Sequence, residues 1–211
     1  MPIFEKDGRR VAFVHVPKVA GTSIELLFKN HGWNMTLHAR HYDPYVPSPQ
    51  HMTYTDLGQA VPDLDSLTSF MVIRSPMARI RSEWQYHFGV LFHTLLDFPD
   101  FVRHMESSLE VSKTYWDNHW RPQSDFASDK MDRIFQIENI SQELPVFLEE
   151  HDIIKNAELP HNNRSQRNKK KVYQRHYRVD QVTADRINRI YGCDYDRFHE
   201  FGYTPDEIKL T

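Results

Sequence analysis

The chain has 211 residues, of which 39% are hydrophobic and 13% aromatic, a composition typical of a globular protein and unlike that of a disordered one. Its net charge of −3 gives no electrostatic reason to expect a nucleic-acid or membrane partner. A lone cysteine, Cys193, excludes an internal disulfide, and no apolar run reaches the roughly 20 residues that span a bilayer. With no signal-peptide pattern at its start, we expect a cytoplasmic protein, a single domain over residues 1–211 without stable membrane insertion.

Three apolar runs predict buried parallel strands, and each is followed by a helical pattern, an alternation typical of an α/β fold. The expected strands are Val11–Val16, Ser69–Arg74 and Arg133–Glu138. The expected helices are Thr22–Asn30, Thr53–Ala60, Pro76–Phe88, Phe98–Leu109, Ser141–His151 and Val179–Tyr191. Ser75 and Ser141 are predicted N-caps. The stretch His38–His51 predicts an irregular loop or lid, and residues 156–176 predict a second loop.

The polar loop after the first strand predicts an anion-binding site. Lys18 supplies a positive charge, Thr22 and Ser23 supply hydroxyl donors, and backbone N–H groups from Gly21 onward begin a helix. The N-terminus of a helix favours negative charge. The lysine stands before the glycine, whereas a Walker motif ends in Gly-Lys-[Ser/Thr]. An ordinary strand-to-helix turn with capping hydroxyls stays open as an alternative.

A second basic group ends the second strand. Ligands bind at the carboxyl ends of parallel strands, so Arg74 and the Lys18 loop face one crevice if their strands are neighbours. The planar guanidinium of Arg74 and the hydroxyl of Ser82 would then hold a second anionic group. The alternative is that Arg74 pairs with Glu83 and that Ser82 lies on a helix surface.

The two segments, FVHVPKVAGTS and MVIRSPMARIRSEW, resemble the signatures of sulfotransferases that use 3′-phosphoadenosine 5′-phosphosulfate (PAPS). In that family the 5′-phosphosulfate loop is commonly PKTGGTS and the 3′-phosphate segment RDPxxRxxSxY. The likeness is closest to the carbohydrate-type branch, typified by heparan sulfate 2-O- and chondroitin sulfotransferases and their bacterial relatives. It continues more weakly through Arg121-Pro122-Gln123-Ser124. Val19-Ala20 replace the usual Thr-Gly, and Ser75 replaces the usual Asp.

The resemblance implies a three-layer α/β fold like that of P-loop kinases, with a central parallel sheet flanked by helices. It implies PAPS as co-substrate, no metal, and a hydroxyl-bearing saccharide or small glycoconjugate as acceptor. The residues it places at the donor are Lys18, Ala20, Gly21, Thr22 and Ser23 for the phosphosulfate and Arg74 and Ser82 for the 3′-phosphate. Lys18 would also act in catalysis, by stabilising the charge on the leaving oxygen.

The predicted general base is His51, at the end of the Pro-rich loop. Related enzymes often place a histidine before a similar short helix, and an imidazole suits proton abstraction near neutral pH. His38, His41 and Asp43 in the same loop are the alternatives, while we expect His15 to be structural.

Two other functions stay open at this point. The chain could be a non-catalytic module that binds an anion or nucleotide, or a phosphotransferase resembling nucleotide kinases. A kinase would need a Gly-Lys-[Ser/Thr] loop and an acidic residue after a strand, whereas SFMVIRS ends in Arg74-Ser75. The basic run Arg164–Arg178 is expected to contact donor or acceptor.

Overall fold

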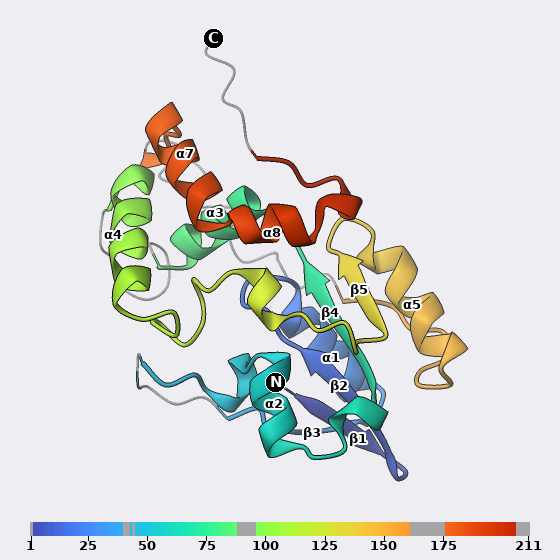
Figure 1. Cartoon of the computed structure of the whole chain (residues 1–211). Helices are drawn as coiled ribbons and strands as arrows, with labels where there is room; N and C mark the ends of the chain where they lie inside the picture. The colour runs from blue at the N-terminus through green and yellow to red at the C-terminus, as the bar shows by residue number, and fades with distance from the viewer. Residues whose placement is uncertain (1, 40–42, 44, 88–95, 161–175, 206–211) are drawn as a thin grey trace.

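The computed structural model of the chain describes residues 2–39, 43, 45–87, 96–160 and 176–205. A five-stranded sheet in the order β3-β1-β2-β4-β5 forms its centre, and helices flank it (Figure 1). Strands β2 (Arg9–Val14), β4 (Thr68–Ile73) and β5 (Arg133–Gln136) run parallel. The three predicted strands and the α/β class are therefore confirmed, with strand ends displaced by one or two residues.

Two antiparallel strands, which the sequence analysis did not predict, extend one edge of the parallel sheet. Strand β1 (Ile3–Lys6) pairs with β2 in a hairpin, and β3 (Asn34–Thr36) pairs with the other side of β1. Asp7 and Gly8 form the turn, with φ of 50° and 75°. An Asp-Gly pair between two apolar segments is a strong hairpin signal, so the sequence contained the information needed to find β1.

All six predicted helices are present, with ends that differ by no more than two residues. They are α1 (Gly21–Asn30), α2 (Tyr54–Ala60), α3 (Pro76–Tyr86), α4 (Phe98–Val111), α5 (Ile140–Glu150) and α7 (Gln181–Ile190); α8 (Gly192–Arg197) is additional. Ser141 is not a cap, because α5 begins one residue earlier, after Asn139. Ser75 holds the N-cap position of α3 without a side-chain capping bond. Within the described residues, no helix combines the length and apolarity needed to cross a membrane.

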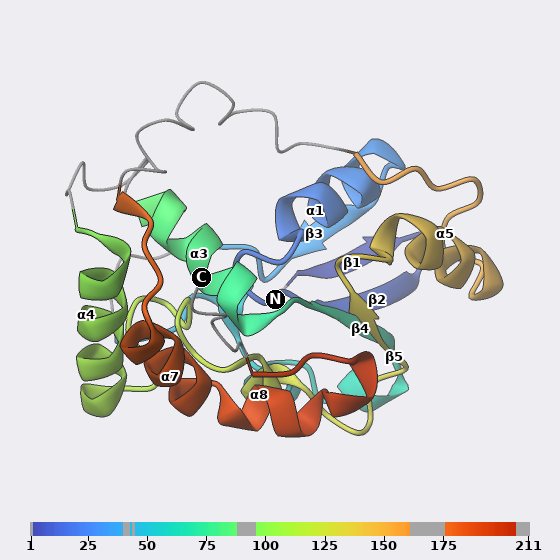
Figure 2. The ribbon, with the colours of Figure 1, turned by 90° about the horizontal axis from the view of Figure 1, so that it is seen from above.

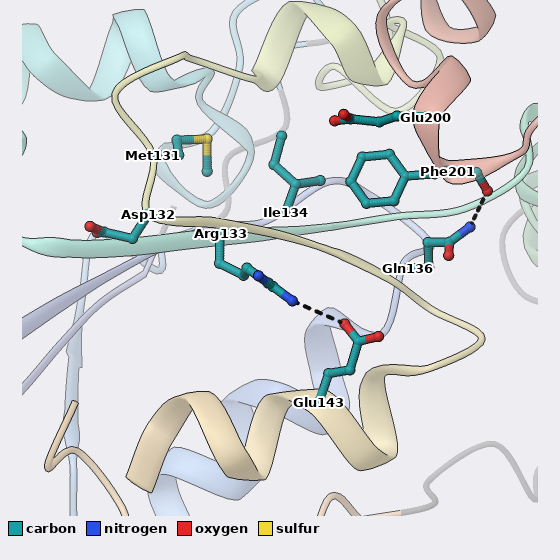
Figure 3. Close-up of a pocket in the computed structure, with 8 residues that line it drawn as sticks. All are labelled: Met131, Asp132, Arg133, Ile134, Gln136, Glu143, Glu200 and Phe201. Carbon is teal, nitrogen blue, oxygen red and sulfur yellow. Dashed lines mark hydrogen bonds and ion pairs between the residues drawn. The ribbon is translucent and has the colours of Figure 1, made fainter. Parts of the chain in front are cut away.

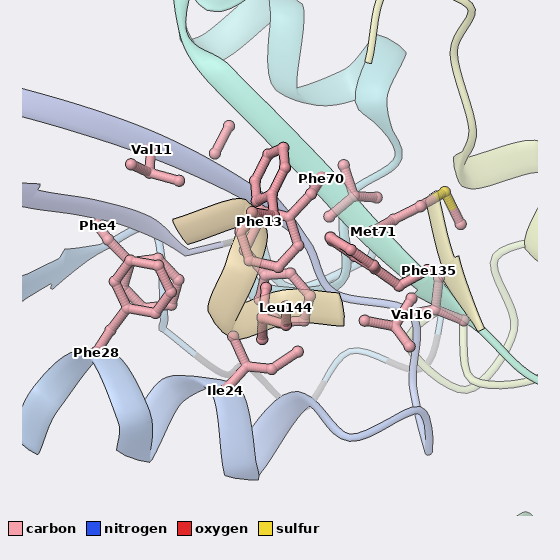
Figure 4. Packing of buried hydrophobic residues seen from close by; sticks show 14 of the residues in the cluster. Phe4, Val11, Phe13, Val16, Ile24, Phe28, Phe70, Met71, Phe135 and Leu144 are labelled. Carbon is pink, nitrogen blue, oxygen red and sulfur yellow. The ribbon is translucent and has the colours of Figure 1, made fainter. Parts of the chain in front are cut away.

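Two hydrophobic clusters hold these elements together. The first fills the space between the sheet and helices α1 and α5, where Phe4 stacks on Phe28 with ring centroids 3.8 Å apart (Figure 4). The second joins α3, α4 and α7 around Trp84, Trp120 and Tyr191, beside the sheet (Figure 2). Burial of each such aromatic contributes on the order of 2–3 kcal/mol. Helix α3, which leaves β4, is thereby fixed between the two clusters.

Helix α2 begins with a capping box that also fixes the chain beside His51. The Thr53 hydroxyl accepts a hydrogen bond from the Asp56 N–H at 3.1 Å, and the Asp56 carboxylate accepts one from the Thr53 N–H at 3.1 Å. Two donors that would otherwise be unpaired at the helix start are therefore satisfied.

We expect Thr53→Ala to lower the free energy of unfolding by about 1 kcal/mol, because the Asp56 N–H loses its acceptor. Urea denaturation followed by circular dichroism measures the change. Thr55→Ala, exposed on the same helix, is the matched control and should change stability by less than about 0.5 kcal/mol. Equal losses in the two variants would contradict the capping role.

Candidate active site

The two predicted anion-binding segments leave the same edge of the sheet. Val14 of β2 lies in register with Met71 of the neighbouring, parallel β4. The Lys18 loop follows the first strand and Arg74 follows the second, so both begin at the carboxyl ends of adjacent strands. The two strands are neighbours, which is the condition under which the Lys18 loop and Arg74 would face one crevice.

The backbone of the Lys18 loop is shaped to receive an anion. Lys18 and Ala20 have positive φ, 65° and 58°, on either side of Val19, and Gly21 begins α1. Such alternation turns successive N–H groups toward one concavity. The amides of Gly21 and Thr22, as the first two of the helix, have no acceptor within it. No acidic residue stands in the first turn to compete for them.

A buried histidine lies directly against this loop. A Cβ built on Gly21 would lie 1.9 Å from Nε2 of His15, so only glycine fits this position. Nδ1 of His15 lies 2.9 Å from the Glu25 carboxylate, to which the Gln50 amide also donates at 3.0 Å. Burial lowers the pKa of His15, although Glu25 opposes the shift. The neutral His15 ring thus packs in a fixed position against the loop, consistent with the structural role expected for it.

The Lys18 side chain reaches helix α3. Its Nζ lies 3.9 Å from the ring centroid of Tyr86, in cation–π contact. Sequence analysis missed Tyr86, although it follows Ser82 by four residues and so lies one turn further along the same helix face. Ser82 is half-buried on α3; in α1, Thr22 is exposed and Ser23 is buried.

Arg74 is fixed through its backbone by a distant side chain. The Gln123 amide accepts from the Arg74 N–H at 3.0 Å and donates to its carbonyl oxygen at 2.8 Å. The buried Asp194 carboxylate in turn accepts from the backbone N–H groups of Gln123 and Ser124. The sequence signal for Gln123 was its position in the segment Arg121–Ser124, where the family resemblance continues weakly.

The surroundings of the Arg74 guanidinium differ from the alternative in which Arg74 pairs with Glu83. Burial lowers its pKa, Glu138 opposes that effect, and the charge of Arg81 adds to it. Glu83 is not its partner, since that carboxylate is bonded to His119.

His51 is held by a carboxylate that sequence analysis did not identify. Nδ1 lies 2.8 Å from Oδ2 of Asp117, and the Ser48 N–H and hydroxyl donate to the same carboxylate. Trp116, Asp117 and Asn118 all have left-handed backbones, with φ of 58°, 56° and 60°. Three such non-glycine residues in a row are costly and persist only where their surroundings fix them.

The environment of His51 keeps its imidazole neutral. Burial lowers its pKa well below the usual 6.5; the hydrogen bond to Asp117 opposes this shift, and the charges of His119 and His15 reinforce it. The neutral ring donates its Nδ1–H to Asp117. Its Nε2 therefore carries the lone pair, the form that a general base requires.

A second histidine, also missed by sequence analysis, lies beside His51. The rings of His119 and His51 meet edge to face with centroids 4.8 Å apart. Nδ1 of His119 lies 3.0 and 3.2 Å from the two carboxylate oxygens of Glu83, and its ring stacks against Tyr86 at 6.1 Å. Arg79 donates to the carbonyl oxygens of His119 and Arg121 at 2.8 and 2.7 Å. The sequence signal for this contact was the four-residue spacing of Arg79 and Glu83, which puts both side chains on one face of α3.

The spacing of this cluster would also suit a metal ion. One nitrogen of each ring and one Asp117 oxygen lie within 4.8 Å of one another. Ser48 and His51 already hydrogen-bond to that carboxylate, so its orientation is fixed without an ion. The absence of a metal requirement stays a prediction.

The other predicted residues lie away from this cluster or outside the described residues. Nε2 of His38 lies 3.2 Å from Glu25, and the exposed Asp43 accepts from the Tyr45 N–H. His41 and most of the basic run Arg164–Arg178 are outside the described residues.

A hollow of about 380 Å³ lies along the edge strand β5 (Figure 3). Its lining contains none of the site residues above, and Asp132, Glu143 and Glu200 outnumber its one cation, Arg133. This charge balance is unsuitable for a strongly anionic ligand.

Substitutions at two adjacent residues of the loop should change the stability of the fold in opposite directions. Ala20→Gly removes the strain of a left-handed alanine and should stabilise the fold by about 1 kcal/mol. Gly21→Ala should destabilise it by about 1–3 kcal/mol, because the new methyl group collides with His15. Thermal unfolding of both variants measures this, and a Gly21→Ala protein as stable as wild type would contradict the contact.

The lowered pKa of His51 predicts a pH-dependent stability. The unfolded chain binds a proton near pH 6.5, whereas the folded chain does so only at lower pH, so this contribution is complete above 6.5 and lost as the pH falls below it. His51→Asn, whose amide can still donate to Asp117, should flatten the stability curve on the acidic side of pH 6.5. Urea titrations at a series of pH values measure how the free energy of unfolding depends on pH. If this dependence below pH 6.5 is the same in His51→Asn and wild type, His51 is not its source.

Comparison with known proteins identifies a family for this chain. A sequence model described as the sulfotransferase family matches residues 2–203, which include the Lys18 loop, Arg74 and both histidines. Neither the curated proteins nor the solved structures give a match. Since the match covers nearly the whole chain, the protein belongs to the sulfotransferase family.

Proposed function

We propose that this protein transfers a sulfuryl group from PAPS to a hydroxyl of a saccharide or small glycoconjugate, on a three-layer fold like that of P-loop kinases. Family membership supports sulfuryl transfer in general. The observation that carries the choice of donor is the presence of two separate cationic sites at one sheet edge, the Lys18 loop after β2 and Arg74 after β4. A nucleotide with both a 3′-phosphate and a 5′-phosphosulfate needs two such sites.

The residues at each site have the chemistry that this donor requires. Lys18, the backbone from Ala20 to Thr22 and the Thr22 and Ser23 hydroxyls would bind the phosphosulfate. Arg74, kept in place by Gln123, would bind the 3′-phosphate together with Ser82.

In this reaction the acceptor oxygen forms a bond to sulfur, while the bond from sulfur to the bridging oxygen breaks. The electron pair leaves with the 5′-phosphate, and Nε2 of His51 takes the acceptor proton. Asp117 orients the ring and stabilises the imidazolium that forms. Lys18 stabilises the charge on the leaving oxygen, the kind of electrostatic term that is usually the largest in such transfers.

Titration with 3′-phosphoadenosine 5′-phosphate tests the donor site. Lys18→Ala and Arg74→Ala should each weaken binding about 10- to 100-fold, since each removes a charge-assisted contact. Arg133→Ala, in the hollow at β5, is the control and should leave affinity unchanged. No binding by wild type at millimolar nucleotide would refute the proposal.

The same assay separates binding from catalysis. His51→Ala should keep nucleotide affinity and lose sulfuryl transfer, measured as sulfated product by mass spectrometry. Retained turnover would remove His51 from the reaction. Tight nucleotide binding by wild type without transfer to any hydroxyl acceptor would indicate a non-catalytic binding module instead.

A further inference from the structure

The active site contains two histidines that are built in the same way. In both, Nδ1 lies about 3 Å from a carboxylate, 2.8 Å for His51 with Asp117 and 3.0 Å for His119 with Glu83. In the neutral ring this nitrogen must be the donor, because a carboxylate only accepts. In that neutral form, both rings present Nε2 as a hydrogen-bond acceptor.

Both Nε2 atoms are available to a ligand. Within the described residues neither has a hydrogen-bond partner, and neither is a buried orphan atom. The side chains retain 7% exposure at His51 and 15% at His119, so the second is the more open of the two. The ring centroids are 4.8 Å apart in an edge-to-face contact, so the two acceptors belong to adjacent rings.

A third histidine near the site, His15, has another role. His15 is also paired with a carboxylate, Glu25, but its Nε2 is directed at the backbone of Gly21. It supports the donor loop and offers no acceptor to the space beside His51. The pair of free acceptors is therefore formed by His51 and His119 alone among these three rings.

We propose that the acceptor of this site presents two neighbouring hydroxyl groups, the reacting one bound by His51 and the second by His119. This inference rests on the proposed sulfotransferase function and specifies its acceptor as a vicinal diol. A single hydroxyl satisfies one ring and leaves the other nitrogen without a donor, which is unfavourable in a mostly buried site. A diol satisfies both, and so His119 selects the acceptor while His51 takes the proton.

The test compares sulfation of methyl glycosides of glucose, galactose and mannose with that of their monodeoxy analogues, using PAPS as donor. For wild type we expect kcat/KM to fall about tenfold when the hydroxyl next to the sulfated one is removed, the effect of one hydrogen bond. Binding of 3′-phosphoadenosine 5′-phosphate, measured by calorimetry, is the separate readout for the donor site.

Two substitutions at one position distinguish recognition from folding. The amide of His119→Asn can still donate to Glu83 but has nothing at the place of Nε2. This variant should sulfate parent and deoxy acceptors equally, at about the wild-type rate for the deoxy compound. The amide of His119→Gln reaches the place of Nε2 and should restore part of the preference. His199→Asn, at an exposed histidine outside the site, should behave as wild type.

Equal rates for parent and deoxy acceptors in wild type, or an undiminished tenfold preference in His119→Asn, would overturn the proposal. So would weakened nucleotide binding in His119→Asn, which would place this residue on the donor side. Wild type that binds the nucleotide but sulfates none of the glycosides would refute the diol and leave the donor site standing. Wild type that does not bind the nucleotide would refute the proposed function itself.

Discussion

The buried charged face of α3 is the constraint on which the site depends. Arg79 and Glu83, one helical turn apart, are both 0% exposed. Charges removed from water must be bonded, because an uncompensated buried charge is strongly destabilising. Nη2 of Arg79 donates to the carbonyl oxygens of His119 and Arg121, and the Glu83 carboxylate bonds to the His119 ring, whereas Nε and Nη1 of Arg79 have no hydrogen-bond partner among the described residues. The loop that follows α4 is thereby fixed against the helix that follows Arg74.

The same loop also contacts the end of the Pro-rich stretch. Its left-handed residues at 116–118 direct Asp117 toward Ser48 and His51, and the Asn118 amide donates to the His51 carbonyl oxygen at 2.8 Å. Three segments distant in sequence thus meet at one point: the end of the Pro-rich stretch, helix α3 and the turn after α4. Displacement of any one of them moves a histidine or its carboxylate.

One aromatic ring joins the proposed donor side to the proposed acceptor side. Tyr86 contacts Lys18 on one side and stacks against His119 on the other. The lysine that we assign to the leaving oxygen and the histidines that we assign to the acceptor are therefore held by the same helix. Such positioning is what in-line group transfer requires, since most of its acceleration comes from orientation and charge stabilisation.

Local patterns were sufficient for much of the fold and for the donor side. Apolar runs gave the three parallel strands, helical spacing gave six helices, and the Lys18 loop and the Arg74-to-Ser82 step are contiguous motifs that pointed to the family. The hairpin was missed although its Asp-Gly turn is a local signal. Each of these features depends on neighbours in the chain, so the sequence by itself determined them.

Only the tertiary structure decided the acceptor side. His51 with Asp117, His119 with Glu83 and Arg74 with Gln123 join residues 66, 36 and 49 positions apart. No periodicity encodes such pairs, because they form when packing brings separate elements together. The lowered pKa of His51 likewise follows from burial, which has no meaning for the unfolded chain. Sequence therefore named the lysine, the arginine and His51, and the fold supplied His119 and the carboxylates that hold both histidines.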